Sequence, residues 1–364
     1  MSPQPRPGIL DVAPYVGGES KAAGANRVIR LASNENALGP SPKAIAAYEA
    51  EKSALHRYPD GGALALRQAI AAAEGLPAEQ IVCGAGSDEL IALLVRAYAG
   101  PGDEVLTSAH AFLMYGISAR TAGAALVAAP ETALTADVDA LLARVTEKTR
   151  ILFLANPNNP TGSYISEAAL RRLHAGLPPS VLLVIDAAYA EYVTASDYPQ
   201  AAGLVEEADN VVMLRTFSKI HALAALRLGW AYAPPAVIDV LNRVRGPFNV
   251  SQAAQAAGIA AIGDRAHIAR SVEHNTEWRG WFAEAAQAAG VEPLPSVGNF
   301  ALLRLPGGQS QAESTLAALK RRGVLLRGVA AYGLANCLRA TVGTEEEMRI
   351  TAEALAEALK ESVA

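Results

Sequence analysis

Between residues 30 and 240, short apolar runs alternate with helical segments, and this alternation is the feature that most restricts the possible folds. Strand-like runs such as RILFLA, VLLVID and NVVMLRT are separated by helical segments such as SDELIALLVRAY and SEAALRRLHAG. Such an order favours a parallel or mostly parallel sheet with helices on both faces. We therefore predict an α/β fold with a large domain at residues 30–240.

The two ends of the chain have a different texture. Residues 1–29 are rich in proline and glycine with little periodicity, which indicates an arm that lies on another part of the molecule. After Pro234-Pro235 come a long alanine-rich helical region at about 250–289, the apolar runs GNFALLRL and NCLRATVG, and a C-terminal helical segment. We expect residues 241–364 to form a smaller α+β domain, with the arm associated with it.

Composition favours an enzyme that acts on a small molecule. Of the 364 residues, 51% are hydrophobic and 18% are charged, which is typical of a chain with a large buried core. A net charge of −5 without a long basic stretch favours neither nucleic acid nor an anionic membrane as a partner. The two cysteines, Cys83 and Cys337, lie in apolar runs, and no apolar stretch reaches the roughly 18 residues of a membrane span. We therefore expect a cytoplasmic protein.

Loops that follow strands are the places to search for a site, because ligands of open α/β sheets bind at the carboxyl ends of the strands. In CGAGSDEL, glycines precede Ser87 at a predicted helix start, where backbone N–H groups and the helix dipole can hold a phosphate. An ordinary capped helix is the alternative. The loop ANPNNPTG combines two prolines with asparagines, and it is more elaborate than a turn requires.

Two charged residues also lie in apolar surroundings. Asp186 ends the apolar run VLLVID, where an unpaired carboxylate is costly, so we expect it to meet a cationic partner or several hydrogen-bond donors, with a helix cap as the alternative. Lys219, in TFSKIHALAALRLGW, precedes a run with only one further charge, Arg227. Lysine is rarely buried because its ammonium is expensive to desolvate, and the alternative is a lysine that points outward from a helix start.

Together these groups match one cofactor, pyridoxal 5′-phosphate. Its aldehyde needs a lysine amine, its pyridine nitrogen needs an acidic partner, and its phosphate needs donors and a cation. The six histidines form no cluster with ligand spacing, so no metal is expected.

The motifs LASNENALGPSP, HRYPDGGALALR, CGAGSDEL, ANPNNPTG, VIDAAYAEY, TFSKIHALAALRLGW, FNVS and CLRATVGT occur in this order over most of the chain. In order and spacing they resemble those of fold-type I, pyridoxal-phosphate-dependent aminotransferases, and most closely the histidinol-phosphate aminotransferases. The resemblance implies a large domain with a mostly parallel sheet, a smaller α+β domain and a homodimer.

The resemblance also implies roles for residues at matching positions around the cofactor ring. Lys219 would bind the cofactor's aldehyde and later move a proton as general base, and Asp186 would pair with the pyridine nitrogen. Asn159 and Tyr189 would hydrogen-bond the ring hydroxyl, and Phe112 would stack on the ring.

The resemblance also implies which residues bind the cofactor's phosphate and which bind the substrate. The phosphate would be held by the following residues: Ser218, Arg227 and the backbone of Gly86, Ser87 and Asp88. Tyr58 resembles a tyrosine that reaches this phosphate from a neighbouring subunit, with a packed interface tyrosine as the alternative. Arg339 would bind the substrate's α-carboxylate, for which a guanidinium is well shaped. Arg327 and Tyr15 would lie near the distal anionic end, although an exposed ion pair is a second interpretation of Arg327.

The implied reaction is a ping-pong transfer of the amino group from L-histidinol phosphate to 2-oxoglutarate. The chain departs from the usual family pattern at HAF (110–112) and at Ala187-Ala188, without loss of a catalytic group. An aromatic amino-acid transaminase is the closest alternative, because it shares the core and differs around the side-chain pocket. A decarboxylase of a phosphorylated amino acid is a further alternative.

Overall fold

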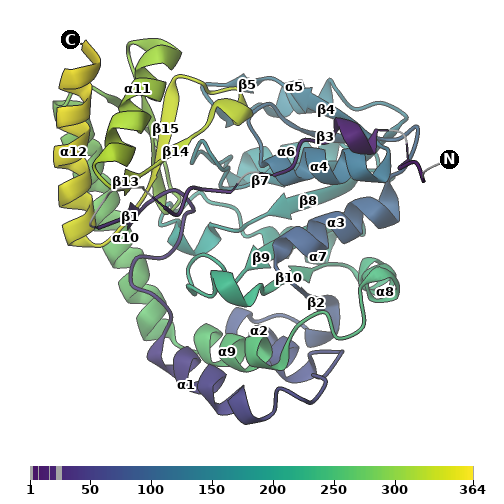
Figure 1. Ribbon diagram of the computed structural model, residues 1–364. Helices are drawn as coiled ribbons and strands as arrows, with labels where there is room; N and C mark the ends of the chain where they lie inside the picture. The colour runs from purple at the N-terminus through teal and green to yellow at the C-terminus, as the bar shows by residue number, and fades with distance from the viewer. Residues whose placement is uncertain (1–2, 7, 16, 22–26, 364) are drawn as a thin grey trace.

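A seven-stranded sheet forms the centre of the computed structural model, which describes residues 3–6, 8–15, 17–21 and 27–363 (Figure 1). In spatial order its strands are β2 (Ile81–Gly84), β10 (Gly229–Tyr232), β9 (Val211–Thr216), β8 (Leu182–Asp186), β7 (Thr149–Ala155), β3 (Glu104–Ser108) and β4 (Ala125–Ala129). All neighbouring pairs are parallel except the two pairs made by β10. The prediction of a mostly parallel sheet is confirmed.

Helices cover both faces of this sheet, as its apolar strands require. In β8, Leu183 and Ile185 belong to one buried cluster and Leu182 and Val184 to another, because successive residues of a strand point to opposite faces. The first cluster takes side chains from α2 (Leu64–Glu74), α6 (Glu167–Gly176) and α9 (Gln252–Ile262). The second takes side chains from α3 (Ser87–Tyr98), α4 (Leu113–Ala122) and α8 (Pro235–Val244).

A second, antiparallel sheet has its own buried cluster and lies beside α10, α11 and α12. Its strands, in spatial order, are β11 (Glu292–Leu294), β12 (Phe300–Arg304), β15 (Cys337–Thr341) and β14 (Arg327–Gly328). The helices are α10 (Arg265–Ala288), α11 (Gly308–Arg321) and α12 (Glu345–Val363). β1 (Ile29–Arg30) pairs in parallel with β13 (Val324–Leu325), so the segment after the N-terminal arm joins this part of the molecule.

The remaining elements connect these layers. They are α1 (Pro42–Ala50), α5 (Val138–Leu142), α7 (Ala201–Glu207), the hairpin β5 (Glu131–Thr132) and β6 (Thr135–Ala136), and the 3-10 turns η1 (Ile9–Asp11), η2 (Glu51–Ser53), η3 (Ala78–Gln80), η4 (Ala190–Tyr192), η5 (Ala224–Leu226) and η6 (Ala330–Tyr332). In the arm, residues 1–2, 7, 16 and 22–26 lie outside the described part of the chain. Over the described ranges, no helix is both long and apolar enough to cross a membrane.

Local patterns misjudged some elements. The helical region at 250–289 consists of two helices, which are separated at Gly263-Asp264. At this break the Asp264 carboxylate accepts a hydrogen bond from the hydroxyl of Ser41, which is distant in the sequence. The sequence pattern did not separate the short strand β10 from the run before it that contains Lys219. β10 is defined by its hydrogen bonds to β2 and β9, and these depend on the tertiary structure. The division at residues 30–240 and 241–364 stays a prediction.

Candidate active site

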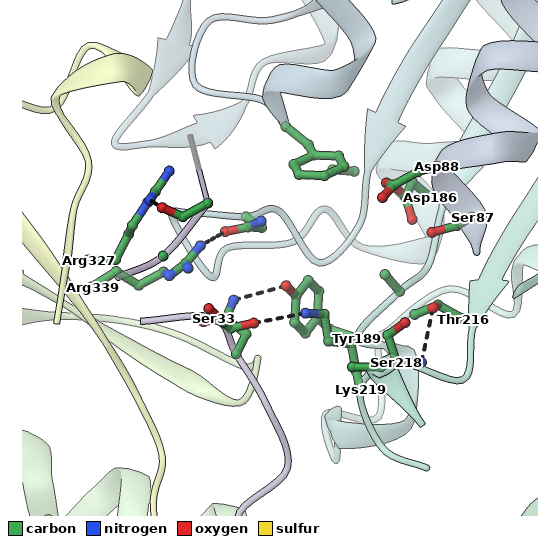
Figure 2. A pocket seen from close by; sticks show the side chains of 18 of the residues that line it. Ser33, Ser87, Asp88, Asp186, Tyr189, Thr216, Ser218, Lys219, Arg327 and Arg339 are labelled. Carbon is green, nitrogen blue, oxygen red and sulfur yellow. Dashed lines mark hydrogen bonds between the residues drawn. The ribbon is translucent and has the colours of Figure 1, made fainter. Parts of the chain in front are cut away.

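A cavity of about 280 Å³ lies where the carboxyl ends of β8 and β9 face the second sheet (Figure 2). The large sheet contributes Asp186, the loop after β9 contributes Lys219, and the second sheet contributes Arg327 and Arg339. A further group, which includes Ser33, comes from the segment that follows β1. The cavity is therefore assembled from several stretches that are far apart in the chain.

Lys219 follows β9 and points its amine into this cavity. Nζ donates a hydrogen bond of 3.1 Å to the carbonyl oxygen of Ser33 and lies 5.7 Å from the centre of the Tyr189 ring. Burial, and then the nearby positive charge of Arg339, lowers the pKa of Lys219 to about 8. About a tenth of this amine is consequently unprotonated at pH 7, far more than for an ordinary lysine, and an unprotonated amine is a nucleophile.

Asp186 is the last residue of β8, and its carboxylate is buried at the base of the cavity. Burial raises the pKa of Asp186 to about 6, while a 2.7 Å hydrogen bond from the Tyr115 hydroxyl to Oδ2 opposes that rise. Oδ1 is buried and has no hydrogen-bond partner among the described residues. Such an orphaned acceptor fits a donor supplied by a ligand, and a protonated pyridine nitrogen is a suitable one.

An anion site lies at the N-terminus of α3. Gly86 precedes the helix with φ +86°, so the first N–H groups of α3 are not capped by a side chain. Nη1 of Arg227 lies 3.4 Å from Oγ of Ser218, and Nη2 lies 3.4 Å from a carboxylate oxygen of Asp88. A guanidinium, a hydroxyl and the positive end of a helix dipole converge here, and this combination suits a phosphate.

Gly86 is needed for this convergence. A Cβ atom at position 86 would lie 2.5 Å from Nη2 of Arg227, and the positive φ disfavours any other residue. The loop therefore lets the guanidinium approach the backbone closely.

Tyr189 and Phe112 border the space between Asp186 and Lys219. The Tyr189 hydroxyl accepts a 2.9 Å hydrogen bond from the side-chain amide of Asn34. Burial raises the pKa of Tyr189 to about 12, so this hydroxyl keeps its proton and can donate it. The rings of Phe112 and Tyr115 form a T-shaped contact, with the ring planes at 87°.

Arg339 forms the wall opposite Asp186. It is 5% exposed, and Nη2 donates a 2.9 Å hydrogen bond to the carbonyl oxygen of Ala32. Nη1 donates to Oδ1 of Asn159, while Nε is buried without a partner among the described residues. A buried guanidinium beside an open cavity is a binding group for a carboxylate.

Arg327 and Tyr15 lie at the outer part of the cavity. Nη1 of Arg327 donates a 2.6 Å hydrogen bond to the carbonyl oxygen of Gly17 in the N-terminal arm. Tyr15, which is half exposed, comes from the same arm and also lines the cavity. The arm thus closes one side of the site.

The cavity brings together most of the residues that the sequence singled out. Those that line it are Tyr15, Ser87, Asp88, Phe112, Asn159, Asp186, Tyr189, Ser218, Lys219, Arg227, Arg327 and Arg339. Gly86 lies against the guanidinium of Arg227. Tyr58 does not line the cavity: it is 83% exposed and stacks on Phe248, with the ring centres 4.7 Å apart.

The cavity also contains residues that the sequence did not single out, among them Asn34, Tyr115 and Tyr332. Asn34 stands within a quoted motif, and Tyr115 lies three positions after Phe112, which is the spacing of one helical turn. Tyr332 comes from η6 near the second sheet, and no local pattern marks it.

Comparisons with known proteins find a matching family and similar chains. Residues 26–355 match the model of the family described as aminotransferase class I and II. A histidinol-phosphate aminotransferase of Rhodospirillum centenum is 58% identical over 358 residues, which are 98% of this chain and 99% of that relative. One of Maricaulis maris is 56% identical, over 99% of this chain and all of the relative.

A solved structure is similar over the whole length of the chain. The crystal structure of histidinol-phosphate aminotransferase from Sinorhizobium meliloti, in complex with pyridoxal 5′-phosphate, superposes with a TM-score of 0.91. It is 28% identical in sequence, and the match covers 100% of this chain and 99% of that one.

Proposed function

The chain belongs to the class I and II aminotransferases, and from this premise we propose that it transfers the amino group of L-histidinol phosphate to 2-oxoglutarate. The products are imidazole-acetol phosphate and L-glutamate. The observation that carries the proposal is that one cavity joins the amine of Lys219 to a buried Asp186 with an orphaned oxygen and to the guanidinium of Arg339.

The residues present fit pyridoxal 5′-phosphate as the cofactor. Asp186 would bind the pyridine nitrogen, and Tyr189 and Asn159 would hold the ring hydroxyl, with Phe112 against the ring face. Arg227, Ser218 and the N-terminus of α3 would hold the phosphate. When bound, the cofactor supplies an aldehyde for amino groups and a ring that accepts electrons from the substrate.

The protein side chains carry the proton transfer. Lys219 would hold the cofactor through Nζ, and the same Nζ, once free, would accept the proton of the substrate's Cα. The low pKa of Lys219 suits this role, because a general base works best with a pKa near the operating pH. The carboxylate of Asp186 keeps the opposite end of the site negative and so favours a protonated ring nitrogen.

Two arginines account for the substrates. Arg339 would bind the α-carboxylate of glutamate and 2-oxoglutarate and so orient the reacting carbon of these two substrates. Arg327, with Tyr15, would bind the distal group, which is a phosphate in histidinol phosphate and a carboxylate in glutamate. A single distal anion site therefore serves both half-reactions, and it favours an anionic donor over a purely aromatic one.

Two measurements test the proposal. Borohydride reduction of the protein loaded with pyridoxal 5′-phosphate, followed by peptide mapping, should place the label on Lys219; a label elsewhere would refute the site. A donor panel should then give a higher kcat/KM for L-histidinol phosphate than for L-phenylalanine. The opposite ratio would make the protein an aromatic amino-acid transaminase.

The proposed assembly is a homodimer, and exposed apolar residues near α1, α2 and α9 support it. The face consists of Ile45, Tyr48, Leu55, Tyr58, Leu64, Phe248 and Ile259, each at least 36% exposed. α1 packs against α9, and α9 against α2, at one end of the molecule (Figure 1). A second copy on this face would bury these side chains and would bring Tyr58 to the neighbour's phosphate site. The cytoplasmic location stays a prediction.

A further inference from the structure

Tyr115 is held from three sides beneath the cavity. Its hydroxyl donates a 2.7 Å hydrogen bond to Oδ2 of Asp186. Its ring stacks on Phe153 of β7, with the centres 4.5 Å apart and the planes at 3°, and it forms a T-shaped contact with the Phe112 ring, with the centres 5.8 Å apart. Tyr115 is fully buried, so few other orientations are open to this hydroxyl.

This contact determines how the Asp186 carboxylate is oriented. A carboxylate on a strand end can rotate about its Cα–Cβ and Cβ–Cγ bonds, and a hydrogen bond to one oxygen limits both rotations. With Oδ2 held by Tyr115, Oδ1 is the oxygen left without a partner among the described residues. Oδ1 is therefore the atom available to a ligand in the cavity.

The charged and titratable groups around Asp186 come from several elements. They are Asp88 of α3, Lys219 after β9, Tyr115 of α4, Tyr189 after β8, and Tyr198. Asp88 raises the pKa of Asp186, as burial does, whereas Lys219 lowers it. The hydrogen bond from Tyr115 also lowers the pKa of Asp186, and burial keeps the Tyr115 hydroxyl itself protonated by raising its pKa.

We propose that Tyr115 is a positioning residue that holds the Asp186 carboxylate ionised, with Oδ1 directed at the pyridine nitrogen of the cofactor. The same ring supports Phe112, so one side chain orients both the group at the edge of the cofactor ring and the group at its face. The inference rests on the proposed cofactor site.

The test is the affinity of the full-length apoprotein for pyridoxal 5′-phosphate, measured by absorbance titration between pH 5.5 and 8.5. In the wild type, affinity should fall as the pH drops through the pKa of Asp186, because protonation removes the negative partner of the ring nitrogen. In Tyr115→Phe the ring contacts remain and the hydroxyl is lost, so the pH at which affinity falls should move upward by about one unit. At pH 5.5, below both pKa values, the variant should bind about eightfold more weakly than the wild type, and near pH 7 the difference should shrink to about twofold.

Two further variants separate this role from general damage. In Asp186→Asn the part of the pH dependence that arises from the titration of Asp186 should disappear, and adding Tyr115→Phe to that background should change the affinity by less than about twofold, because the effect acts through Asp186. Tyr232→Phe removes another buried tyrosine hydroxyl that lies 3.4 Å from a carboxylate, that of Glu206, and it should titrate like the wild type.

Tyr115→Phe with the wild-type pH profile would overturn the proposal, as would an equally large effect of Tyr115→Phe in the Asp186→Asn background. Failure of the wild type itself to bind pyridoxal 5′-phosphate would instead overturn the cofactor site and this inference with it.

Discussion

The side-chain amide of Asn34 donates a 2.9 Å hydrogen bond to the hydroxyl of Tyr189, and the backbone N–H of Asn34 donates one to Oγ1 of Thr341. Tyr189 follows β8 of the large sheet, and Thr341 ends β15 of the second sheet. Asn34 therefore links the two halves of the cavity from a third segment of the chain.

Asn34→Ala should destabilise the protein. Asn34 is buried, and its loss leaves the Tyr189 hydroxyl without its donor, so the free energy of unfolding should fall by about 1–3 kcal/mol in a urea titration. The exposed Asn242→Ala, which loses a surface contact with Arg245, should stay within about 0.5 kcal/mol of the wild type. Equal effects of the two changes would contradict the bridging role.

The amine of Lys219 should react with pyridoxal 5′-phosphate at a lower pH than an ordinary lysine. Because the pKa of Lys219 is lowered from 10.5 to about 8, the unprotonated fraction grows up to pH 8 and is nearly complete above it. The rate of covalent capture by the apoprotein, followed by stopped-flow absorbance, should rise about tenfold per unit below pH 8 and then level off. A rise that continues to pH 10 would show an unperturbed lysine, and Lys219→Ala should show no capture.

Gly86→Ala should weaken binding through the phosphate. The added Cβ would lie 2.5 Å from Nη2 of Arg227, so the guanidinium must move away from the N-terminus of α3. We expect about a tenfold or greater loss of affinity for pyridoxal 5′-phosphate by equilibrium dialysis, and no comparable loss for pyridoxal, which lacks the phosphate. Gly100→Ala is the control, because there is open space around its new methyl group. It should bind both pyridoxal 5′-phosphate and pyridoxal like the wild type.

Arg339→Lys should impair substrate use while leaving the cofactor bound. A lysine cannot replace the two hydrogen bonds that the guanidinium donates to Ala32 and Asn159, nor bind a carboxylate with two parallel N–H groups. We expect kcat/KM for glutamate to fall by about 100-fold, which is about 2.7 kcal/mol of transition-state stabilisation. Arg243→Lys, on the exposed side of α8, is the matched control, and a loss below threefold in Arg339→Lys would remove Arg339 from the substrate site.

Leu55→Asp should separate the subunits of the proposed homodimer. Leu55 is 76% exposed on the apolar face defined above, and a carboxylate there would be costly to bury against a second copy. Analytical ultracentrifugation should show a monomer for Leu55→Asp and a dimer for both the wild type and Leu10→Asp, because Leu10 is similarly exposed but lies in η1 of the arm. Identical sedimentation of all three would place the interface elsewhere.

Much of the fold follows from local patterns. The apolar runs around Leu183 and Val212 became neighbouring parallel strands, and the prediction of helices on both faces is confirmed. These patterns depend only on residues that are near in the sequence. Strands that are apolar on both faces must be covered by other elements on both faces, so the pattern also predicts the helical layers. The short strand β10 and the break at Gly263-Asp264 were not predicted, because each depends on a partner that is far away in the chain.

The candidate site divides in the same way. Lys219, Asp186 and the glycine loop before Ser87 could be singled out from the sequence, because their residue types are costly or unusual in apolar surroundings and the sheet topology places strand ends together. The contacts that orient these residues could not be predicted from the sequence, because the partners are far apart in it. Tyr115 and Asp186 are 71 positions apart, and Asn34 and Tyr189 are 155 positions apart.

The amino-acid sequence by itself thus determined the chemistry available to this protein and the elements that carry it, because both arise from residue type and short-range periodicity. Only the tertiary structure decided which oxygen of Asp186 is open to a ligand and which groups Arg339 and Tyr189 bind. It also placed Tyr58 away from the cavity of its own chain. Those features depend on strand register and on how the two sheets and the segment around Asn34 pack together, and packing joins residues that no local pattern connects.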